Sequence, residues 1–424
     1  MFREQAWRNE LTQPGSTAAT GGCTMCGRTQ DMAFPDYCAH CGGAVVLPAA
    51  AHPLPDTTDL PGMWRYTGRL PIAPDTAWLS MGEGDTPIVP AAGAAGWCGV
   101  ERLVFKLDHL NPSGSFKDRA TAVGMAQAVR QRASAVVCAS SGNAAGSTAA
   151  YAARAGLPAV VLMPEAVPPG KAAVARAHGA AVLRVRGDYS NAFRAARELA
   201  GRFGWINLTT TFVNPVAVAG LKSAGYELAS QLAGPPDWIV VPVGAGPLVH
   251  GIVTAYREMR DSGEVAAVPR ILGVQAEGCA PVAEAFARDA AEVAPWQDVR
   301  TRISAISDPL RGYPSDGTYT LRLVRETGGA MTAVDDAEAD EAVTQLAHRE
   351  GLLIESGAAA GLVAVRALRG NGTVRAEETV VCMLTGNGVK TLSADVDSGP
   401  VVTDADEAVD RLRANTALAE GMTA

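Results

Sequence analysis

The segment Asn111–Ala120 carries the side chain best suited to covalent chemistry. It reads Asn-Pro-Ser-Gly-Ser-Phe-Lys-Asp-Arg-Ala, so that Lys117 follows a small, bendable turn and opens a run, Asp118–Gln131, that is compatible with a helix. A lysine amine can form a Schiff base with an aldehyde cofactor. The amine must be held in place and partly desolvated to react. An isolated lysine here would most simply be a solvated residue of a first helical turn, so this interpretation depends on other segments.

Three loops that follow short apolar runs supply those other segments. Ser140-Ser141-Gly142-Asn143 precedes an alanine-rich stretch, where it can cap a helix and offer free amides to a carboxylate. Gly244-Ala245-Gly246-Pro247-Leu248 lets backbone amides approach a phosphate closely, although Pro247 has no N–H to donate. The third loop is Thr385-Gly386-Asn387-Gly388. Each loop alone could be a plain cap or turn, so their combination with Lys117 is what favours a cofactor site.

These segments resemble the threonine-synthase branch of the fold-type II pyridoxal phosphate (PLP) enzymes, in the tryptophan synthase β-subunit-like superfamily. The resemblance rests first on Asn111-Pro-Ser-Gly-Ser-Phe-Lys-Asp-Arg, and it covers the chain from about Trp64 to Asp397. It implies that PLP is the cofactor and that Lys117 is the catalytic residue that binds it as a Schiff base. It also implies a small amino acid as the substrate.

The resemblance further assigns roles to the loops. It implies that Asn143 binds the ring hydroxyl of the cofactor and that Thr385 faces the pyridine nitrogen. A neutral hydroxyl there suits elimination and replacement better than transamination, because it cannot stabilise a protonated ring as a carboxylate would. The implied cofactor site consists of Phe116, Lys117, Asn143, Gly244, Ala245, Gly246, Pro247, Leu248 and Thr385. The implied substrate site consists of Ser140, Ser141, Gly142, Ala144 and Lys222.

One matching segment departs from the family pattern. Threonine synthases usually carry Asn-Pro-x-Arg-x-x-Gly-Gln-Lys-Thr, in which the arginine helps to grip the substrate's phosphate. This chain reads Asn214-Pro-Val-Ala-Val-Ala-Gly-Leu-Lys-Ser, with Ala217 and Leu221 at the changed places. A bidentate arginine contact is stronger than an ordinary hydrogen bond. We therefore expect weaker use of O-phosphohomoserine or a different leaving group, with Lys222 or Arg119 as the nearest replacement cations.

Two more segments fit the resemblance. Glu83-Gly-Asp-Thr-Pro-Ile is similar to a family motif near the mouth of the active site. Glu355-Ser-Gly-Ala-Ala-Ala-Gly is similar to the start of a late family helix. Glu355 itself is either a buried, paired acid or a direct participant in the site.

Four of the eight cysteines predict a metal site. They form two Cys-x-x-Cys-Gly segments, which contain Cys23, Cys26, Cys38 and Cys41. Four thiolates at this spacing suit a tetrahedral zinc ion, and so short a module could not fold without a metal. A vestigial ribbon or a redox dithiol is the alternative. A closed four-cysteine site has no open position, so we expect a structural role. The remaining cysteines lie in apolar contexts typical of a core.

Composition limits the remaining possibilities. The chain has 424 residues, a net charge of −8 and a hydrophobic content of 48%, which describes a globular protein of about two domains rather than a nucleic-acid-binding one. No run of 18 apolar residues predicts a membrane span, and the first ten residues lack the apolar core of a secretory signal. We therefore expect a cytoplasmic protein that binds neither nucleic acid nor membrane and forms a homodimer.

The pattern of elements predicts an α/β fold. Short apolar runs alternate with alanine-rich helical stretches, which indicates parallel sheets with crossover helices. The expected strands are 103–107, 135–138, 159–163, 181–185, 238–243, 271–276 and 379–384. The expected helices include 144–155, 170–178, 191–203 and 219–232. The resulting prediction is two three-layer parallel-sheet domains of the tryptophan synthase β-like type and a small zinc ribbon. The expected boundaries are a loose arm at 1–20, the ribbon at 21–50, a large PLP domain at 63–99 and 216–400, a smaller domain with the Schiff-base lysine at 100–215, and a tail at 401–424.

The functional expectation is a PLP-dependent elimination or replacement on an amino acid, with threonine synthase or a close paralogue as the default. A β-replacement synthase of the cysteate or cysteine type and a serine/threonine dehydratase are alternatives. A catalytically silent, metal-stabilised binding protein is the alternative outside enzymes, and the intact Lys117 segment argues against it.

Overall fold

The computed structural model describes residues 20–32, 35–49, 59–140, 142–167 and 169–391. The described residues up to Val389 belong to one compact unit, and Lys390 begins a second. The predicted tail at 401–424 and nearly all of the predicted arm at 1–20 lie outside the described residues. Among the helices described, none has both the length and the apolar character needed to cross a membrane.

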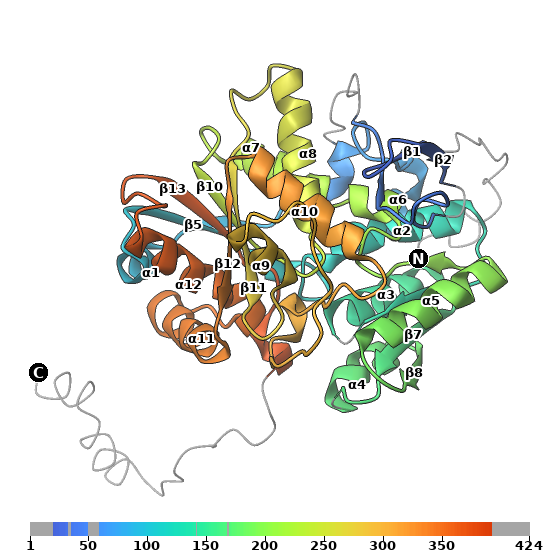
Figure 1. Cartoon of the computed structure of the whole chain (residues 1–424). Helices are drawn as coiled ribbons and strands as arrows, with labels where there is room; N and C mark the ends of the chain where they lie inside the picture. The colour runs from blue at the N-terminus through green and yellow to red at the C-terminus, as the bar shows by residue number, and fades with distance from the viewer. Residues whose placement is uncertain (1–19, 33–34, 50–58, 141, 168, 392–424) are drawn as a thin grey trace, which may run out of the picture. The chain divides into compact units, whose positions relative to one another are not determined.

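A six-stranded sheet forms the larger part of the fold (Figure 1). Its strand order is β12-β11-β10-β13-β5-β4, and every neighbouring pair is parallel except β4 with β5. The strands are β4 (Ile88–Pro90), β5 (Arg102–Lys106), β10 (Trp238–Pro242), β11 (Arg270–Ala276), β12 (Ala330–Val334) and β13 (Thr379–Met383).

Both faces of this sheet are covered, as the continuous apolar runs predict. Ile239 and Val241 of β10 pack in a cluster with residues of α7 (Lys222–Gln231) and α8 (Pro247–Asp261). Trp238 and Val240 point to the opposite face, into a second cluster. The second cluster contains residues of α1 (Ala92–Cys98), α11 (Asp336–Glu350) and α12 (Ser356–Gly370). Alternating side chains of one strand therefore hold helices on both sides of the sheet.

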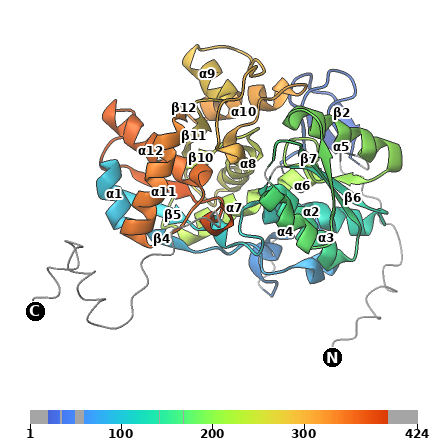
Figure 2. The ribbon, with the colours of Figure 1, turned by 90° about the horizontal axis from the view of Figure 1, so that it is seen from below.

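A four-stranded parallel sheet with the order β8-β7-β6-β9 forms the smaller part. Its strands are β6 (Val136–Ala139), β7 (Ala159–Pro164), β8 (Ala181–Val185) and β9 (Ile206–Asn207). Around it lie α2 (Lys117–Arg130), α3 (Asn143–Ala155), α4 (Pro169–Ala177) and α5 (Tyr189–Phe203), which Figure 2 shows gathered about β6 and β7. The remaining helices are α6 (Pro215–Ala219), α9 (Pro281–Ala287) and α10 (Pro314–Glu326).

The fold confirms the predicted α/β class and corrects three details. Strand β5 pairs with β13 and β4, so residues 102–106 belong to the larger sheet, not to the smaller domain predicted to begin at residue 100. Strands β4, β9 and β12 were not predicted from the sequence. The helix expected over 219–232 begins only at Lys222 as α7, because the separate short helix α6 ends at Ala219 and Gly220 lies between them. A Cβ on Gly220 would lie 2.2 Å from the carbonyl oxygen of Arg119, so the close approach of α2 requires a glycine there.

The N-terminal segment forms a small antiparallel sheet with the order β2-β1-β3. Its strands are β1 (Thr20–Cys23), β2 (Thr29–Asp31) and β3 (Val45–Val46). The two turns that carry the paired cysteines contain Gly27 and Gly42, which have φ angles of 73° and 71°. A glycine adopts this left-handed conformation without steric cost, which explains why each Cys-x-x-Cys pair is followed by glycine.

Tyr37 anchors this small sheet to the rest of the protein. Its hydroxyl donates to Oδ2 of Asp316 at 2.9 Å, and the same carboxylate oxygen accepts the amide of Phe212 at 3.1 Å. Its ring lies 6.2 Å from that of Phe193 in α5 and 6.3 Å from that of Tyr313, which precedes α10. One buried side chain from the N-terminal sheet thus contacts helices of both larger sheets.

Replacing Tyr37 by phenylalanine is expected to lower the free energy of unfolding by about 1–3 kcal/mol, because Asp316 loses a buried hydrogen-bond donor. Urea denaturation followed by circular dichroism measures the change. Tyr256→Phe is the matched control, since the buried Tyr256 hydroxyl has no partner among the described residues. Equal effects of the two substitutions would show that the Tyr37 hydrogen bond contributes nothing specific.

Candidate functional site

Lys117 is the first residue of α2, and the loop before it is fixed at several points. The amide of Phe116 donates to the carbonyl of Thr385 at 3.0 Å, which ties this loop to the one after β13. Asp118 accepts the amide of Ser113 at 2.7 Å and the hydroxyl of Ser147 at 2.6 Å. The backbone that presents Lys117 is therefore held by both the larger and the smaller sheet.

The Lys117 amine lies in an environment that suits a nucleophile. The side chain is enclosed by protein, yet part of its surface remains accessible. Removal from water lowers its pKa to about 8, although the acidic groups of Cys138, Glu355 and Asp308 oppose this shift. A lysine usually titrates near 10.5, so far more of this amine is neutral at physiological pH. The neutral form is the one that attacks an aldehyde.

The other lysines are less suited to this task. The chain contains five, at positions 106, 117, 171, 222 and 390. Lys106 donates to Glu227 at 2.7 Å, and Lys222 donates to Glu258 at 3.0 Å, so both are held as buried ion pairs. Lys390 is exposed, and the side chain of Lys171 is not among those described. Among the lysines whose side chains are described, Lys117 alone is enclosed by protein and has no direct carboxylate partner.

Asn143 and Glu355 meet beside the Lys117 loop. The Asn143 amide donates to both carboxylate oxygens of Glu355, at 2.9 and 3.0 Å. A Cβ on Gly386 would lie 2.0 Å from Oε1 of Glu355, so this acid lies directly against the third loop. The sequence suggested that Glu355 is either a paired acid or a participant, and the structure pairs it with the residue expected at the cofactor ring.

The loop before α3 is partly described. The Ser140 hydroxyl accepts the amide of Gly142 at 3.1 Å, and Ala144 is buried in the first turn of the helix. Ser141 lies outside the described residues. Ser140, Gly142 and Asn143 lie at the N-terminus of α3, where a helix favours an anion.

The glycine-rich loop after β10 fits a phosphate. Within the described part of the chain, the amides of Ala245, Gly246 and Leu248 have no hydrogen-bond acceptor. They lie at the N-terminus of α8, where the helix dipole favours an anion. Gly246 has a φ of 103°, and a Cβ there would lie 2.0 Å from the Thr320 hydroxyl. The loop therefore keeps free N–H donors in spite of Pro247, and the side chain of Thr320 packs closely against Gly246.

Thr385 is buried at the end of β13, and its carbonyl holds the Lys117 loop. Its hydroxyl makes no hydrogen bond to any residue that the structure describes. This leaves the hydroxyl available to a ligand.

The expected anion contacts of Lys222 and Arg119 are not supported. Lys222 is engaged with Glu258 and with the carbonyl of Arg69, at 2.8 Å. Arg119 is fully buried and binds Asp108 at 2.8 Å and Glu227 at 2.6 Å. Both cations are already neutralised by carboxylates. The assignment of Lys222 to the substrate site is therefore corrected to a buried structural ion pair.

Ala217 lies in a packed helix interface. Its Cβ would be 2.9 Å from a Cβ on Gly124, which shows how closely α6 approaches α2 at this point. A larger side chain at either position would force the helices apart. The alanine that stands in place of the family's arginine therefore allows α6 and α2 to pack this closely.

Asp308 lies beside the glycine-rich loop, a position that the sequence did not reveal. It lies on the loop before α10, and its Cβ is 3.6 Å from the position of a Cβ on Gly244. It is enclosed by protein but partly accessible, like Lys117. Burial raises the pKa of the Asp308 carboxyl, while the amide of Leu310, the hydroxyl of Tyr313 and Lys117 oppose the shift. An isolated Asp-Pro in a long loop gives no sequence signal of this position.

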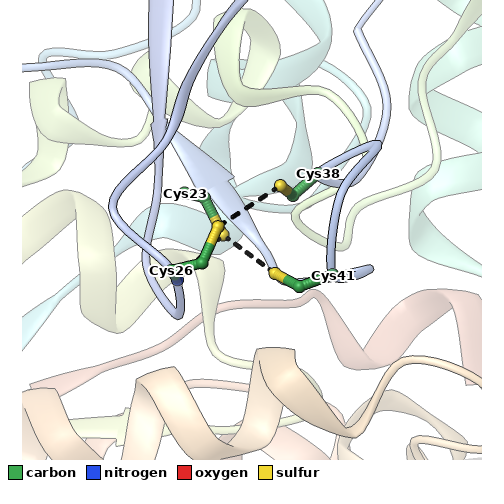
Figure 3. A group of neighbouring side chains, drawn as sticks. All are labelled: Cys23, Cys26, Cys38 and Cys41. Carbon is green, nitrogen blue, oxygen red and sulfur yellow. Dashed lines mark hydrogen bonds between the residues drawn. The ribbon is translucent and has the colours of Figure 1, made fainter.

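The four predicted metal-binding cysteines converge (Figure 3). Their sulfur atoms all lie within 4.8 Å of one another, with Cys23 and Cys41 at 3.5 Å and Cys26 and Cys38 at 3.7 Å. A disulfide would bring two sulfurs to about 2 Å. A tetrahedron with zinc–sulfur bonds of about 2.3 Å has edges of about 3.8 Å. Backbone amides of Cys41 and His40 lower the pKa of the Cys38 thiol to about 7. Against the opposing amide of Gly43, hydrogen bonds with the neighbouring cysteines raise the pKa of the Cys41 thiol to about 12.

Comparisons with known proteins identify the family of this chain. The family described as pyridoxal-phosphate dependent enzyme matches residues 79–386. The threonine synthase of Methanocaldococcus jannaschii is 33% identical over 377 residues, which cover 87% of this chain and 92% of that protein. The threonine synthase of Methanosarcina acetivorans is 36% identical over 360 residues, which cover 84% and 87%.

Solved structures show the same fold. A threonine deaminase from T.th. has a TM-score of 0.59 at 27% identity, over 74% of this chain and 94% of that one. Maize serine racemase has a TM-score of 0.61 at 20% identity, over 74% and 91%. The likeness to serine racemase bears on the fold alone.

Proposed function

Because this chain belongs to the pyridoxal-phosphate-dependent enzyme family, we propose that it catalyses elimination or replacement on an amino acid, as a threonine synthase or a close paralogue of one. The observation that carries the proposal is the desolvated Lys117 amine, held between the loops of Asn143 and Thr385 and accompanied by the free amides of the Gly244–Leu248 loop. The names of the related proteins support the reaction class.

Each group of the site has a role that suits this reaction. When bound, PLP would act as a sink for the electrons released at the α-carbon of the substrate. The amides of Ala245, Gly246 and Leu248 would hold its phosphate, and Lys117 would bind it covalently. Lys117, once released, would move protons to and from the substrate carbons, a task for which a pKa near 8 is well matched. The loop at Ser140–Asn143 would orient the substrate's α-carboxylate.

Chemical trapping tests this proposal. Borohydride reduction of the purified protein, followed by peptide mapping, is expected to place the cofactor on Lys117. An adduct on Lys106, Lys171, Lys222 or Lys390 would refute the assignment. Protein that lacks the visible absorbance of bound PLP after reconstitution would favour the silent binding protein instead.

We also propose that Cys23, Cys26, Cys38 and Cys41 bind one structural zinc ion. Their sulfur separations match the edges of a tetrahedron and leave no position for a substrate. Elemental analysis of freshly purified, reduced protein is expected to give one zinc per chain. A Cys26→Ser/Cys41→Ser variant should lose the metal, whereas Cys279→Ala, at a buried cysteine outside the cluster, should retain it. Metal-free wild-type protein would exclude the site.

We further propose a cytoplasmic homodimer. None of the eight cysteines, all of which lie among the described residues, forms a disulfide, as is usual in a reducing compartment. Sedimentation velocity at several protein concentrations tests the dimer, and a single species with the mass of one chain would contradict it.

A further inference from the structure

The glycine-rich loop Gly244–Leu248 leaves the same edge of the larger sheet as the loop that holds Lys117. Strands β10 and β13 are parallel neighbours, so the loops that follow them lie at one edge of the sheet. The loop after β13 carries the Thr385 carbonyl that accepts the amide of Phe116, next to Lys117. The free amides of the glycine-rich loop therefore lie at the edge where the cofactor would be bound.

Thr320 of α10 lies directly behind the glycine-rich loop. Its side chain is fully buried, and its hydroxyl donates to the carbonyl of Ala245 at 2.7 Å. The carbonyl and the N–H of one trans peptide unit point in opposite directions. Because Thr320 binds the carbonyl of the Ala245–Gly246 peptide, the N–H of Gly246 points away from α10.

Gly246 itself does not fix this orientation. Turning the Ala245–Gly246 peptide over would change the φ angle of Gly246, which is 103°, and a glycine adopts positive and negative φ about equally readily. The next peptide is already fixed, because the Gly246 carbonyl accepts the amide of His250 at 3.2 Å in the first turn of α8. The contact with Thr320 is thus what holds the preceding peptide in one orientation.

A second buried side chain, Gln275 of β11, acts on the peptide before that one. Its Oε1 accepts the amides of Val282 and Ala283, at 2.8 and 3.0 Å. Its Nε2 is therefore left to donate to the carbonyl of Gly244, at the longer distance of 3.4 Å. The N–H of the Gly244–Ala245 peptide consequently points away from Gln275. Two of the loop's free amides are aimed by buried side chains behind the loop.

Pro247 increases the importance of these donors. Because a proline has no N–H, the loop lacks one donor between the amides of Gly246 and Leu248. Hydrogen bonds to a charged acceptor are roughly twice as strong as those between neutral groups. Turning the Gly246 N–H away from a phosphate should therefore have a measurable effect on binding.

We propose that Thr320 is a positioning residue for the phosphate of the cofactor. Its hydroxyl holds the Ala245–Gly246 peptide in the orientation in which the Gly246 N–H meets that phosphate, and Thr320 does not contact the cofactor itself. This inference rests on the proposed function, because it takes PLP to bind with its phosphate at the Gly244–Leu248 loop.

Binding of two forms of the cofactor to the full-length protein, freed of PLP, tests the proposal. PLP and pyridoxal share the ring and the aldehyde and differ in the phosphate, so the ratio of their dissociation constants measures what the phosphate site contributes. Titrations followed by visible absorbance give both constants. Thr320→Val keeps the shape of the side chain and removes the hydroxyl. We expect it to raise the dissociation constant for PLP by about tenfold and to leave that for pyridoxal unchanged.

Three further variants serve as controls. Thr320→Ser keeps the hydroxyl and should bind PLP as the wild-type protein does. Thr320→Ala removes the hydroxyl without adding bulk, so it should repeat the effect of Thr320→Val if that variant folds poorly, as circular dichroism would show. Thr318→Val is the matched change on the same helix. Thr318 accepts the amide of Val293 at 3.0 Å, away from the glycine-rich loop, so both dissociation constants should stay unchanged.

The outcomes separate this inference from the proposed function. Unchanged PLP affinity in the variants without a hydroxyl at position 320 would overturn the role of Thr320. Equal weakening of PLP and pyridoxal would also overturn it, because it would indicate a general structural effect. Equal binding of both forms to the wild-type protein would do the same, since the loop would then not hold the phosphate.

These titrations need no amino-acid substrate. A protein that shows the expected effect of Thr320→Val but converts no amino acid would leave the inference intact and overturn the proposed function. Failure of the wild-type protein to bind either form would overturn both.

Discussion

Replacement of Lys117 by alanine is expected to abolish covalent attachment of PLP and to lower turnover by at least about 10²–10⁴-fold, the contribution usual for a positioned acid–base group. The expected loss in this protein is larger, because Lys117 would serve both as the covalent anchor and as the proton carrier. Absorbance of the reconstituted protein and product formation from an amino-acid panel measure the two effects.

Lys390→Ala provides the control, since Lys390 is exposed at the end of the described chain. The fold should survive the Lys117 change, because the contacts that fix its loop come from the backbone of Phe116 and the side chain of Asp118. Full activity of Lys117→Ala with unchanged absorbance would eliminate the proposed function.

Replacement of Arg119 by methionine is expected to have the largest effect on stability. Arg119 binds Asp108 and Glu227, and all three side chains are at most 2% exposed. Removing the arginine leaves these carboxylates with Lys106 as the remaining buried cation of the network. Breaking a buried ion pair in this way typically costs about 3–5 kcal/mol, because an uncompensated charge stays buried. Urea denaturation, monitored by circular dichroism, gives the change in the free energy of unfolding.

Arg130→Met is the matched control on the same helix. Arg130 pairs with Asp75, but the two side chains are 37% and 55% exposed. Exposed pairs contribute about 0–1 kcal/mol, so this substitution should change stability little. If both substitutions cost the same, the buried network would contribute no more than an ordinary surface pair.

The sequence predicted those parts of the fold that depend on local pattern. The apolar run at 238–243 appears as β10, and the alanine-rich stretch at 144–155 appears as α3, each within about one residue of its expected bounds. The threonine-synthase resemblance is confirmed by the related proteins. Strand β5 was assigned to the wrong sheet, because pairing with β13 joins residues more than 270 positions apart and leaves no local signal.

The same limit applies to the site. The motif around Lys117 indicated the chemistry, and the four-cysteine spacing indicated the cluster that the structure brings together. The sequence could not show that Lys222 is paired with Glu258, since both residues lie on helices and the pairing depends on how α7 and α8 pack. The position of Asp308 beside Gly244 gave no signal in the sequence, because it arises from the fold of the loop around Asp308.

The contacts of Tyr37 also set an order in which the protein can be completed during synthesis. Its partner Asp316 lies 279 positions later in the chain. At typical translation rates of about 5–20 residues per second, the ribosome needs roughly 15–55 s to travel from one residue to the other. Throughout that interval the N-terminal sheet has emerged without Asp316, the buried partner of its Tyr37 hydroxyl. The zinc ion proposed at the four cysteines would then be what holds this segment together until α10 has been made.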